Sequence, residues 1–243
     1  MKKLIFNNYQ AEDLGFIVVE GAPEILAQED YEVVAIEGRN GSLIVNKGTY
    51  PDIEKTFTIT AIDYIDEDNI EDMMDSIKKW FFDIKDSRLF YTFNNKYNIV
   101  KKVIFNEDVR TSFEEFGDFQ VTFLCEPFYY EDEENIVITK SSNEAPQKEF
   151  TNNGDFESFP CIKIYGTGSV YFYLNNVSIA IKNITTYVEV DTKLLTCLDA
   201  KGKNKINDLV SDFPTFNRGV NSIQIPSDQN ITRIEIIPRT IYR

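Results

Sequence analysis

The chain has 243 residues, of which 42% are hydrophobic and 14% aromatic. That is enough apolar material for one large or two ordinary folded domains, and it argues against a disordered chain. The formal net charge of −15 argues against binding a nucleic-acid backbone or an anionic membrane, because both need clustered Lys and Arg. The charge is uneven: residues 1–130 hold 13 Lys or Arg and 25 Asp or Glu, whereas residues 131–243 hold 12 and 15. This imbalance favours two domains.

The sequence lacks the usual ingredients of catalysis. It has no histidine, the commonest general acid–base group near neutral pH and the commonest metal ligand. The motifs G-x-S-x-G, G-x-x-x-x-G-K-[ST] and H-E-x-x-H are absent. Cys125, Cys161 and Cys197 are widely spaced, which indicates buried free thiols in a reducing compartment rather than a disulfide or metal site. We therefore expect no catalytic residue, no cofactor and no metal, and the protein is not expected to be an enzyme.

No targeting signal is expected at the N-terminus. Met1, Lys2 and Lys3 precede only three apolar residues, 4–6, which is too short for the core of a signal peptide. No apolar run approaches the roughly 18–20 residues that a membrane span requires. We expect synthesis in a cytoplasm and no membrane partner.

Strands dominate the predicted elements of the first half. Alternation of apolar and polar residues, or short apolar runs, predict strands at 4–6, 16–19, 31–37, 43–45, 56–62, 89–93, 99–105, 109–116 and 119–126. Asn40-Gly41 is a strong hairpin signal, which places a hairpin at about 33–50. Its apolar residues have no obvious core of their own. Such a surface is a liability unless another subunit covers it, so we expect it to project toward a neighbour.

One helix is predicted, at about 68–83. Its apolar residues recur at three- and four-residue steps and form a single stripe, which we expect to pack on a sheet rather than hold a cofactor. Asp66, Glu67 and Asp68 supply an N-cap and negative charge at its start, and Lys78 and Lys79 lie near its end. The stripe comprises Ile70, Met73, Met74, Ile77, Trp80 and Phe81.

The second half reads as a chain of antiparallel hairpins. Residues 131–149 are acidic and then polar, with Pro146, and are predicted to be a linker. From residue 150 onward, alternating strands at 161–165, 169–175 and 177–181 are separated by turn residues, as in a β-sandwich. The predicted class is therefore mainly β: two β-sandwich domains, 1–130 and 150–243, the first with one α-helix packed on it.

Motifs in both halves resemble one family. N-N-G-x-x-E-S-x-P at 152–160, G-x-G at 166–168, strands ending in L-N-N and in V-D, and F-P-x-x-x-x-G-x-N at 213–221 occur in order, before an Ile-rich strand with Pro and Arg at 234–239. Together they resemble the C-terminal half of the siphophage distal tail (Dit) proteins, tail components of phages or prophages that infect Gram-positive hosts. Two motifs resemble the N-terminal half of the same family. One is I-x-G-R-N-G-S-L followed by G-x-Y, and the other is G-x-F-x-x-x-F-x-x-x-P-F-x-Y at 117–130, at the end of the first half. Asn40 replaces the Asp that is more usual in the hairpin, and it supports the same turn.

The resemblance implies a structural component of a phage tail tip. It implies a homohexameric ring built by the N-terminal domain, which joins the major tail tube protein to the tail-associated hub protein. It also implies a galectin-like, jelly-roll C-terminal domain that projects outward and carries receptor-binding proteins. DNA would pass through the ring without specific binding, past acidic residues of the first domain lining the bore. The expected location is the virion tail tip, after assembly in the host cytoplasm.

Two sets of candidate surface residues follow. The first is an oligomer interface at the hairpin, formed by Arg39, Asn40, Leu43, Ile44 and Tyr50. The second belongs to an alternative function, a non-catalytic protein that recognises host cell-wall sugars. In that case Tyr171, Tyr173 and Tyr187 would stack on sugar rings, although outward-facing tyrosines on strands more often pack against cross-strand neighbours.

Overall fold

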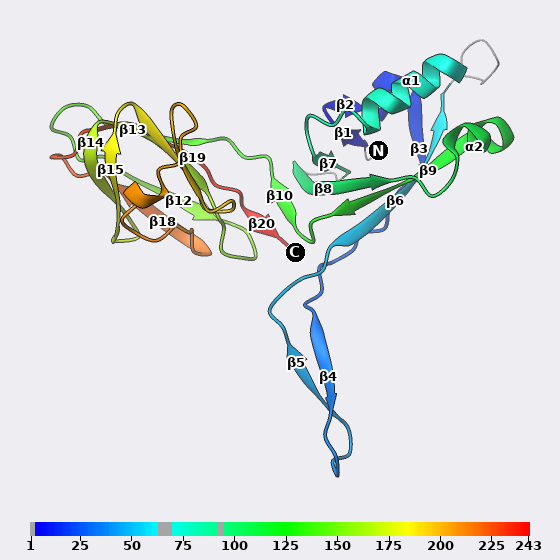
Figure 1. Ribbon diagram of the computed structural model, residues 1–243, viewed down its shortest axis with the longest axis horizontal. Coiled ribbons are helices and arrows are strands. Elements are labelled where there is room, and N and C mark those ends of the chain that lie inside the picture. The colour runs from blue at the N-terminus through cyan, green and yellow to red at the C-terminus, as the bar shows by residue number, and fades with distance from the viewer. Residues whose placement is uncertain (1–2, 63–69, 92–94) are drawn as a thin grey trace. The chain divides into compact units, whose positions relative to one another are not determined.

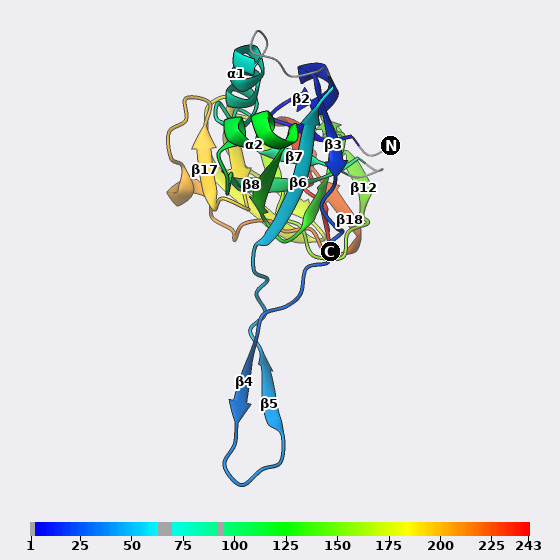
Figure 2. The same ribbon diagram turned by 90° about the vertical axis from the view of Figure 1, so that its right-hand side faces the viewer.

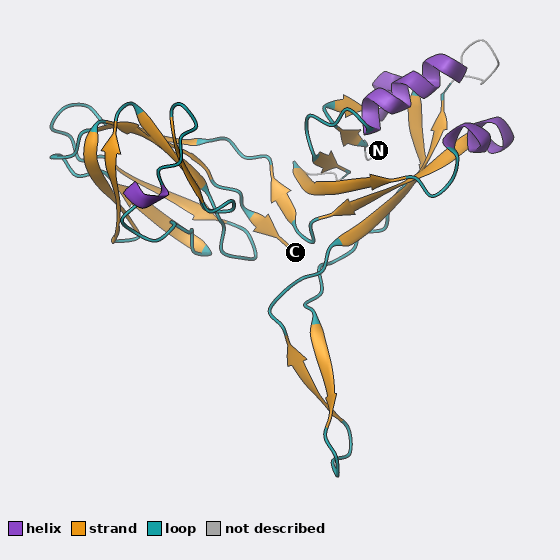
Figure 3. Ribbon diagram, viewed as in Figure 1, coloured by secondary structure: helices purple, strands orange, loops and turns teal. Residues whose placement is uncertain are grey.

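The computed structural model describes residues 3–62, 70–91 and 95–243. The chain divides into two compact units, an N-terminal unit of Met1–Tyr130 with Arg243 and a C-terminal unit of Glu131–Tyr242. The predicted mainly-β class is confirmed: antiparallel sheets are the main regular structure of both units, and both described α-helices belong to the N-terminal unit (Figure 3).

The N-terminal unit is built on one sheet. Its strands run in the order β2-β1-β7-β8-β9-β6-β3, and β10 also pairs with β8. Long central strands give it a continuous inner face, because side chains alternate and β6 buries every second residue. The strands are β1 (Ile5–Phe6), β2 (Tyr9–Gln10), β3 (Phe16–Glu20), β6 (Ile53–Ala61), β7 (Arg88–Phe90), β8 (Lys96–Ile104), β9 (Asp118–Cys125) and β10 (Tyr129–Glu131).

Helix α1 (Ile70–Phe81) covers the inner face of this sheet, as the apolar stripe predicts. Trp80 is fully buried and stacks on Phe16 with ring centroids 5.9 Å apart, and its Nε1 donates to the carbonyl of Phe6 at 3.1 Å. The stripe is therefore core. The predicted N-cap residues, Asp66 to Asp68, lie outside the described residues. A short 3₁₀ turn, η1 (Ala11–Leu14), precedes β3.

A second helix, α2 (Val109–Phe116), lies where alternation predicted a strand, so that prediction was wrong. The capping residues explain the helix. The side chain of Asp108 accepts a hydrogen bond from the backbone N–H of Thr111 at 2.9 Å, and Gly117 closes the last turn with φ 77°. Phe113 then packs on Phe119 of β9, with ring centroids 5.0 Å apart, and anchors the helix.

Strands β4 (Tyr31–Ala35) and β5 (Ser42–Asn46) form a separate two-stranded sheet. Figures 1 and 2 show this hairpin extending away from the sheet of the N-terminal unit. Its pairing runs from Tyr31–Asn46 to Ala35–Ser42, and residues 36–41 form the tip. An isolated two-stranded hairpin is marginal in water, so its exposure needs an explanation.

The C-terminal unit is a sandwich of two antiparallel sheets with the orders β11-β19-β13-β16-β17 and β12-β18-β14-β15. Inward side chains of both sheets form one buried cluster, for example Phe172 of β14 and Val188 of β16. The elements are β11 (Ile136–Thr139), β12 (Gln147–Asn152), β13 (Cys161–Gly166), β14 (Gly168–Leu174), β15 (Val177–Ile184), β16 (Tyr187–Asp191), β17 (Thr196–Asp199), η2 (Ile206–Asp208), β18 (Gly219–Gln224), β19 (Ile231–Ile237) and β20 (Ile241–Tyr242).

Residues 131–149 are not simply a linker, which corrects the prediction. Ile136–Thr139 forms β11 and pairs with β19, from Ile136–Ile236 to Thr139–Arg233. Ile138 is buried in the core of the sandwich. Charged and polar neighbours masked this short apolar run in the sequence.

Candidate interaction surfaces

The described residues form neither a metal-binding site nor a pair of redox-active thiols. They contain no group of three or more His, Cys, Asp or Glu side chains that could hold a metal ion. Cys125, Cys161 and Cys197 are buried and unpaired, as predicted. Burial raises the pKa of the Cys125 thiol to about 12 and those of Cys161 and Cys197 to about 11. No helix in the described ranges has the length and apolar character needed to cross a membrane.

The β4–β5 hairpin is apolar on both faces. Directly paired residues share a face, so Val33 and Ile44 lie on one side, and Val34 and Leu43 on the other. Val33 and Ile44 are 57% and 62% exposed, and Leu43 is 41% exposed. Neither face has a core beneath it. Apolar surface exposed on both sides of a ribbon is typical of segments that take part in protein–protein contacts.

The base of the hairpin is held by polar contacts. Lys47 and Asp30 form a salt bridge at 2.8 Å, and the backbone N–H of Lys47 donates to the carbonyl of Asp30 at 2.9 Å. The hydrogen bond from Lys47 lowers the pKa of Asp30. These contacts fix where the ribbon leaves the N-terminal unit.

The structure brings together only part of the predicted interface set. Arg39 and Asn40 lie in the exposed tip, next to Leu43 and Ile44 of β5. Tyr50 instead lies beyond the base of the ribbon. Its ring packs on Phe128 with centroids 4.9 Å apart, and its hydroxyl accepts from Arg243 Nη2 at 2.7 Å. Tyr50 therefore belongs to the body of the N-terminal unit.

The three candidate sugar-stacking tyrosines do not converge. Tyr171 and Tyr173 lie on the outer face of the β14 sheet, because Val170, Phe172 and Leu174 point into the core. Tyr187 lies on the outer face of the other sheet, with Lys163 Nζ 5.0 Å from its ring centroid. Tyr171 and Tyr173 pack edge to face with centroids 5.6 Å apart. The three rings cannot form one platform.

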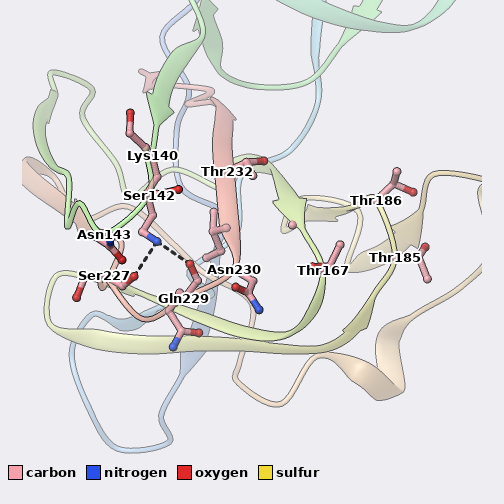
Figure 4. Close-up of a pocket in the computed structure, with 13 residues that line it drawn as sticks. Lys140, Ser142, Asn143, Thr167, Thr185, Thr186, Ser227, Gln229, Asn230 and Thr232 are labelled. Atoms are coloured by element: carbon pink, nitrogen blue, oxygen red, sulfur yellow. Dashed lines mark hydrogen bonds between the residues drawn. The ribbon is translucent and has the colours of Figure 1, made fainter.

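A polar cleft of about 440 Å³ opens at one end of the C-terminal sandwich (Figure 4). Lys140 is the only charged residue that lines it, and no aromatic ring does. Its Nζ donates to the carbonyls of Ser227 at 2.9 Å and Gln229 at 2.7 Å, drawn as dashed lines. The Lys140 ammonium thus links the loop after β11 to the loop between β18 and β19. The rest of the lining is mainly hydroxyl and amide groups, including those of Thr167, Thr185, Thr186, Asn230 and Thr232.

A second cleft, of about 410 Å³, lies between the β14–β15 hairpin and residues 211–217. We call it the β15-edge cleft. Two of the sequence motifs meet there: Leu174 and Asn175 come from L-N-N, and Phe213 and Pro214 from F-P-x-x-x-x-G-x-N. The final Asn of the second motif, Asn221, accepts a hydrogen bond from Asn175 Nδ2 at 2.8 Å. The sequence alone did not identify this cleft as a site, although the two motifs whose residues line it were visible there.

Comparison with known proteins finds similarity of structure only. No protein-family model and no curated protein matches the sequence. Among solved structures, the SPP1 Dit (gp 19.1) protein is similar over 97% of this chain and 98% of its own, with a TM-score of 0.65 and 13% sequence identity. The fold is Dit-like. The SPP1 structure is described as a paradigm of the hub adsorption apparatus in Gram-positive infecting phages. The Dit-like similarity extends over both units of the chain, which matches the order of the sequence motifs.

Proposed function

We propose that this protein is a structural, non-enzymatic component of a phage tail tip. In this proposal six copies form a ring that joins the tail tube to the tail-associated hub protein. The ring carries receptor-binding proteins and leaves a central passage for DNA. The N-terminal unit builds the ring, and the C-terminal unit is a galectin-like module that holds receptor-binding proteins.

The observation that carries the proposal is the Dit-like fold over 97% of the chain. Similarity to one sandwich alone would be weak support, because β-sandwiches serve many functions. Here the match spans both the helix-bearing N-terminal unit and the two-sheet C-terminal unit of this chain. The β4–β5 hairpin, apolar on both faces, is a second feature that fits subunit packing.

The acidity of the N-terminal unit has a role in this proposal. Residues 1–130 carry 25 acidic against 13 basic side chains. Carboxylates lining the bore would repel the DNA phosphates and let the duplex slide without sticking. A structure of the assembled ring tests this point: acidic residues should line the lumen, and a neutral or basic lumen would contradict it.

Native mass spectrometry and light scattering test the ring directly. The protein is measured alone and then with the tail tube and tail-associated proteins encoded beside it. A six-fold assembly is the expected result in the mixture, and a chain that stays monomeric with both partners present contradicts the proposal. The flanking reading frames give an independent check, with a tape-measure protein expected upstream and a large tail-associated protein downstream.

The alternative, a carbohydrate-binding protein, gains no support from the tyrosines, which lie on opposite faces of the sandwich. A glycan array separates the two functions, because specific binding by a monomeric chain would favour the alternative.

A further inference from the structure

The free edge of β15 is only partly covered. β15 is the edge strand of its sheet, and it pairs with β14 on its inner side. The chain after η2 returns to this edge: Leu209 forms a single bridge with Ile181, and the N–H of Val210 donates to the carbonyl of Ala180 at 2.9 Å. After Val210 no further bridge to β15 forms within the described residues. The β15-edge cleft begins where this pairing ends.

The uncovered part of the edge presents backbone groups. Because the carbonyl of Ala180 points outward to Val210, alternation places the N–H and C=O of Ser178 on the same outer edge. The described chain places no strand opposite Ser178 on that side. Such an edge is a template for one more strand.

The walls of the cleft suit an extended peptide. Val177, which is 62% exposed, and Phe213 offer apolar contacts on either side. The hydroxyl of Ser211 is buried and has no hydrogen-bond partner in the described part of the chain, so it is poised to bond an incoming polar group. Asp212 is the only charged residue of the lining, and it is exposed.

The cleft is held in shape before anything binds. Asn175 Nδ2 donates to Asn221 Oδ1 at 2.8 Å, and Asn175 Oδ1 accepts from the N–H of Ser222 at 2.9 Å. The N–H of Asn217 also donates to Asn221 Oδ1, at 3.0 Å. Across the loop, Thr192 Oγ1 donates to the carbonyl of Pro214 at 2.7 Å. A preformed site loses less entropy on binding.

We propose that the β15-edge cleft binds an extended segment of another polypeptide, which adds a strand to β15. The segment pairs with the N–H and C=O of Ser178 and continues the pairing that Val210 makes with Ala180. Its alternate side chains are apolar and contact Val177 and Phe213. A Lys or Arg at one end pairs with Asp212, in keeping with the strongly acidic chain. A peptide fits better than a sugar because the cleft offers the free edge of a strand, and Phe213 is the one aromatic residue in its lining.

A random dodecapeptide display library, selected against the purified full-length protein, is the test. Enriched peptides should alternate apolar residues and carry Lys or Arg near one end. Their affinity should fall at least about tenfold with Ser178→Pro, which removes the outward N–H. Asp212→Asn should weaken only peptides that carry Lys or Arg. Val220→Ser is the matched control, because Val220 is 68% exposed on β18 but does not line the cleft. The enriched peptides should bind this variant as tightly as the wild type.

Thermal unfolding of each variant separates lost binding from lost folding. If Ser178→Pro fails to fold, Val177→Asp gives the same test, because its side chain is exposed and its added charge removes the apolar contact. The proposal is overturned if no peptide is enriched. It is also overturned if enriched peptides bind the folded cleft variants as tightly as the wild type, or if a glycan array gives a ligand that Ser211→Ala abolishes while no peptide competes with it.

Discussion

Arg239 forms a bidentate ion pair with Asp191: Nη1 donates to Oδ1 at 2.6 Å, and Nη2 donates to Oδ2 at 2.7 Å. Asp191 ends β16, and Arg239 follows β19, so the pair ties two parts of the C-terminal unit together. The same Oδ1 accepts the N–H of Leu194 at 3.0 Å and orders the following turn. The Asp191 side chain is only 8% exposed, so this is a largely desolvated, two-hydrogen-bond ion pair. The V-D ending of the sequence motif thus has a structural role.

Replacing Asp191 with Asn should destabilise the C-terminal unit by about 3 kcal/mol, because it removes the negative charge of a largely buried ion pair with Arg239. Urea unfolding measures the change. Glu189→Gln is the matched control: Glu189 lies two residues away and pairs with Lys163 at 3.1 Å, but both side chains are more exposed. Its loss should cost at most about 1 kcal/mol. Equal losses in the two variants would contradict this ranking.

The same pair predicts a dependence on pH. Burial pushes the pKa of Asp191 up, but the hydrogen bonds from Arg239 and from the Leu194 N–H outweigh it, so the pKa lies below its usual 3.8. A carboxyl group whose pKa is lower in the folded protein than in the unfolded chain stabilises the fold above about pH 4. This contribution is lost as the pH falls through the pKa of the folded state. The stability gap between wild type and Asp191→Asn should therefore be constant near neutrality and shrink below about pH 4. Unfolding curves across that range check it, and a gap that widens in acid would refute the assignment.

The two glycines of the G-x-G turn serve different purposes, which a pair of alanine variants can separate. A Cβ on Gly166 would lie 2.4 Å from the carbonyl oxygen of Asn230, a backbone atom that cannot move aside cheaply. Gly166→Ala should cost about 3 kcal/mol. Gly168 has φ 80° with open space around it, so Gly168→Ala should cost only the left-handed backbone strain, about 1–2 kcal/mol. Thermal unfolding of both variants measures the order, and the reverse order would show that the close approach is not what requires Gly166.

Sequence reasoning recovered the elements whose pattern is local and long. The stripe from Ile70 to Phe81 is helical and mostly buried, and the alternating apolar residues of β6, β9 and β14 face the core as expected. It failed at residues 109–116, where alternation and helical spacing compete over eight residues. The capping pair of Asp108 and Gly117 decided the outcome.

The surfaces were only partly predictable, because they depend on contacts between distant residues. The Asn-Gly signal located the hairpin, and its apolar residues showed that it lacks a core. The β15-edge cleft joins Asn175 to Asn221 and Phe213, which are far apart along the chain. No local pattern states that these residues meet. Their motifs were visible in the sequence, but their common location required the fold.

The cysteines should resist thiol reagents in the folded protein. Burial raises the pKa of Cys125 to about 12 and that of Cys161 to about 11, so almost no thiolate exists near neutral pH. Titration with an aromatic disulfide at pH 8 should detect less than one thiol per chain in buffer and all three in guanidinium chloride. Fast reaction of one thiol under native conditions would show that its strand opens locally.

The hairpin gives the sharpest test of the proposed ring. Leu43 is 41% exposed and lies outside both buried clusters, so Leu43→Asp should change the free energy of unfolding by no more than about 0.5 kcal/mol. If a neighbouring subunit covers that face, burying the new charge should weaken each subunit contact by about 2 kcal/mol or more and stop ring formation. Gln28→Glu is the matched control, since it adds the same charge to an exposed residue of the segment that leads to the hairpin and removes no apolar surface. Sedimentation of the wild type and both variants, in the presence of the tail partners, should show rings for the wild type and Gln28→Glu and folded monomers for Leu43→Asp. Rings of normal size from Leu43→Asp would mean that this face of the hairpin does not touch a neighbouring subunit.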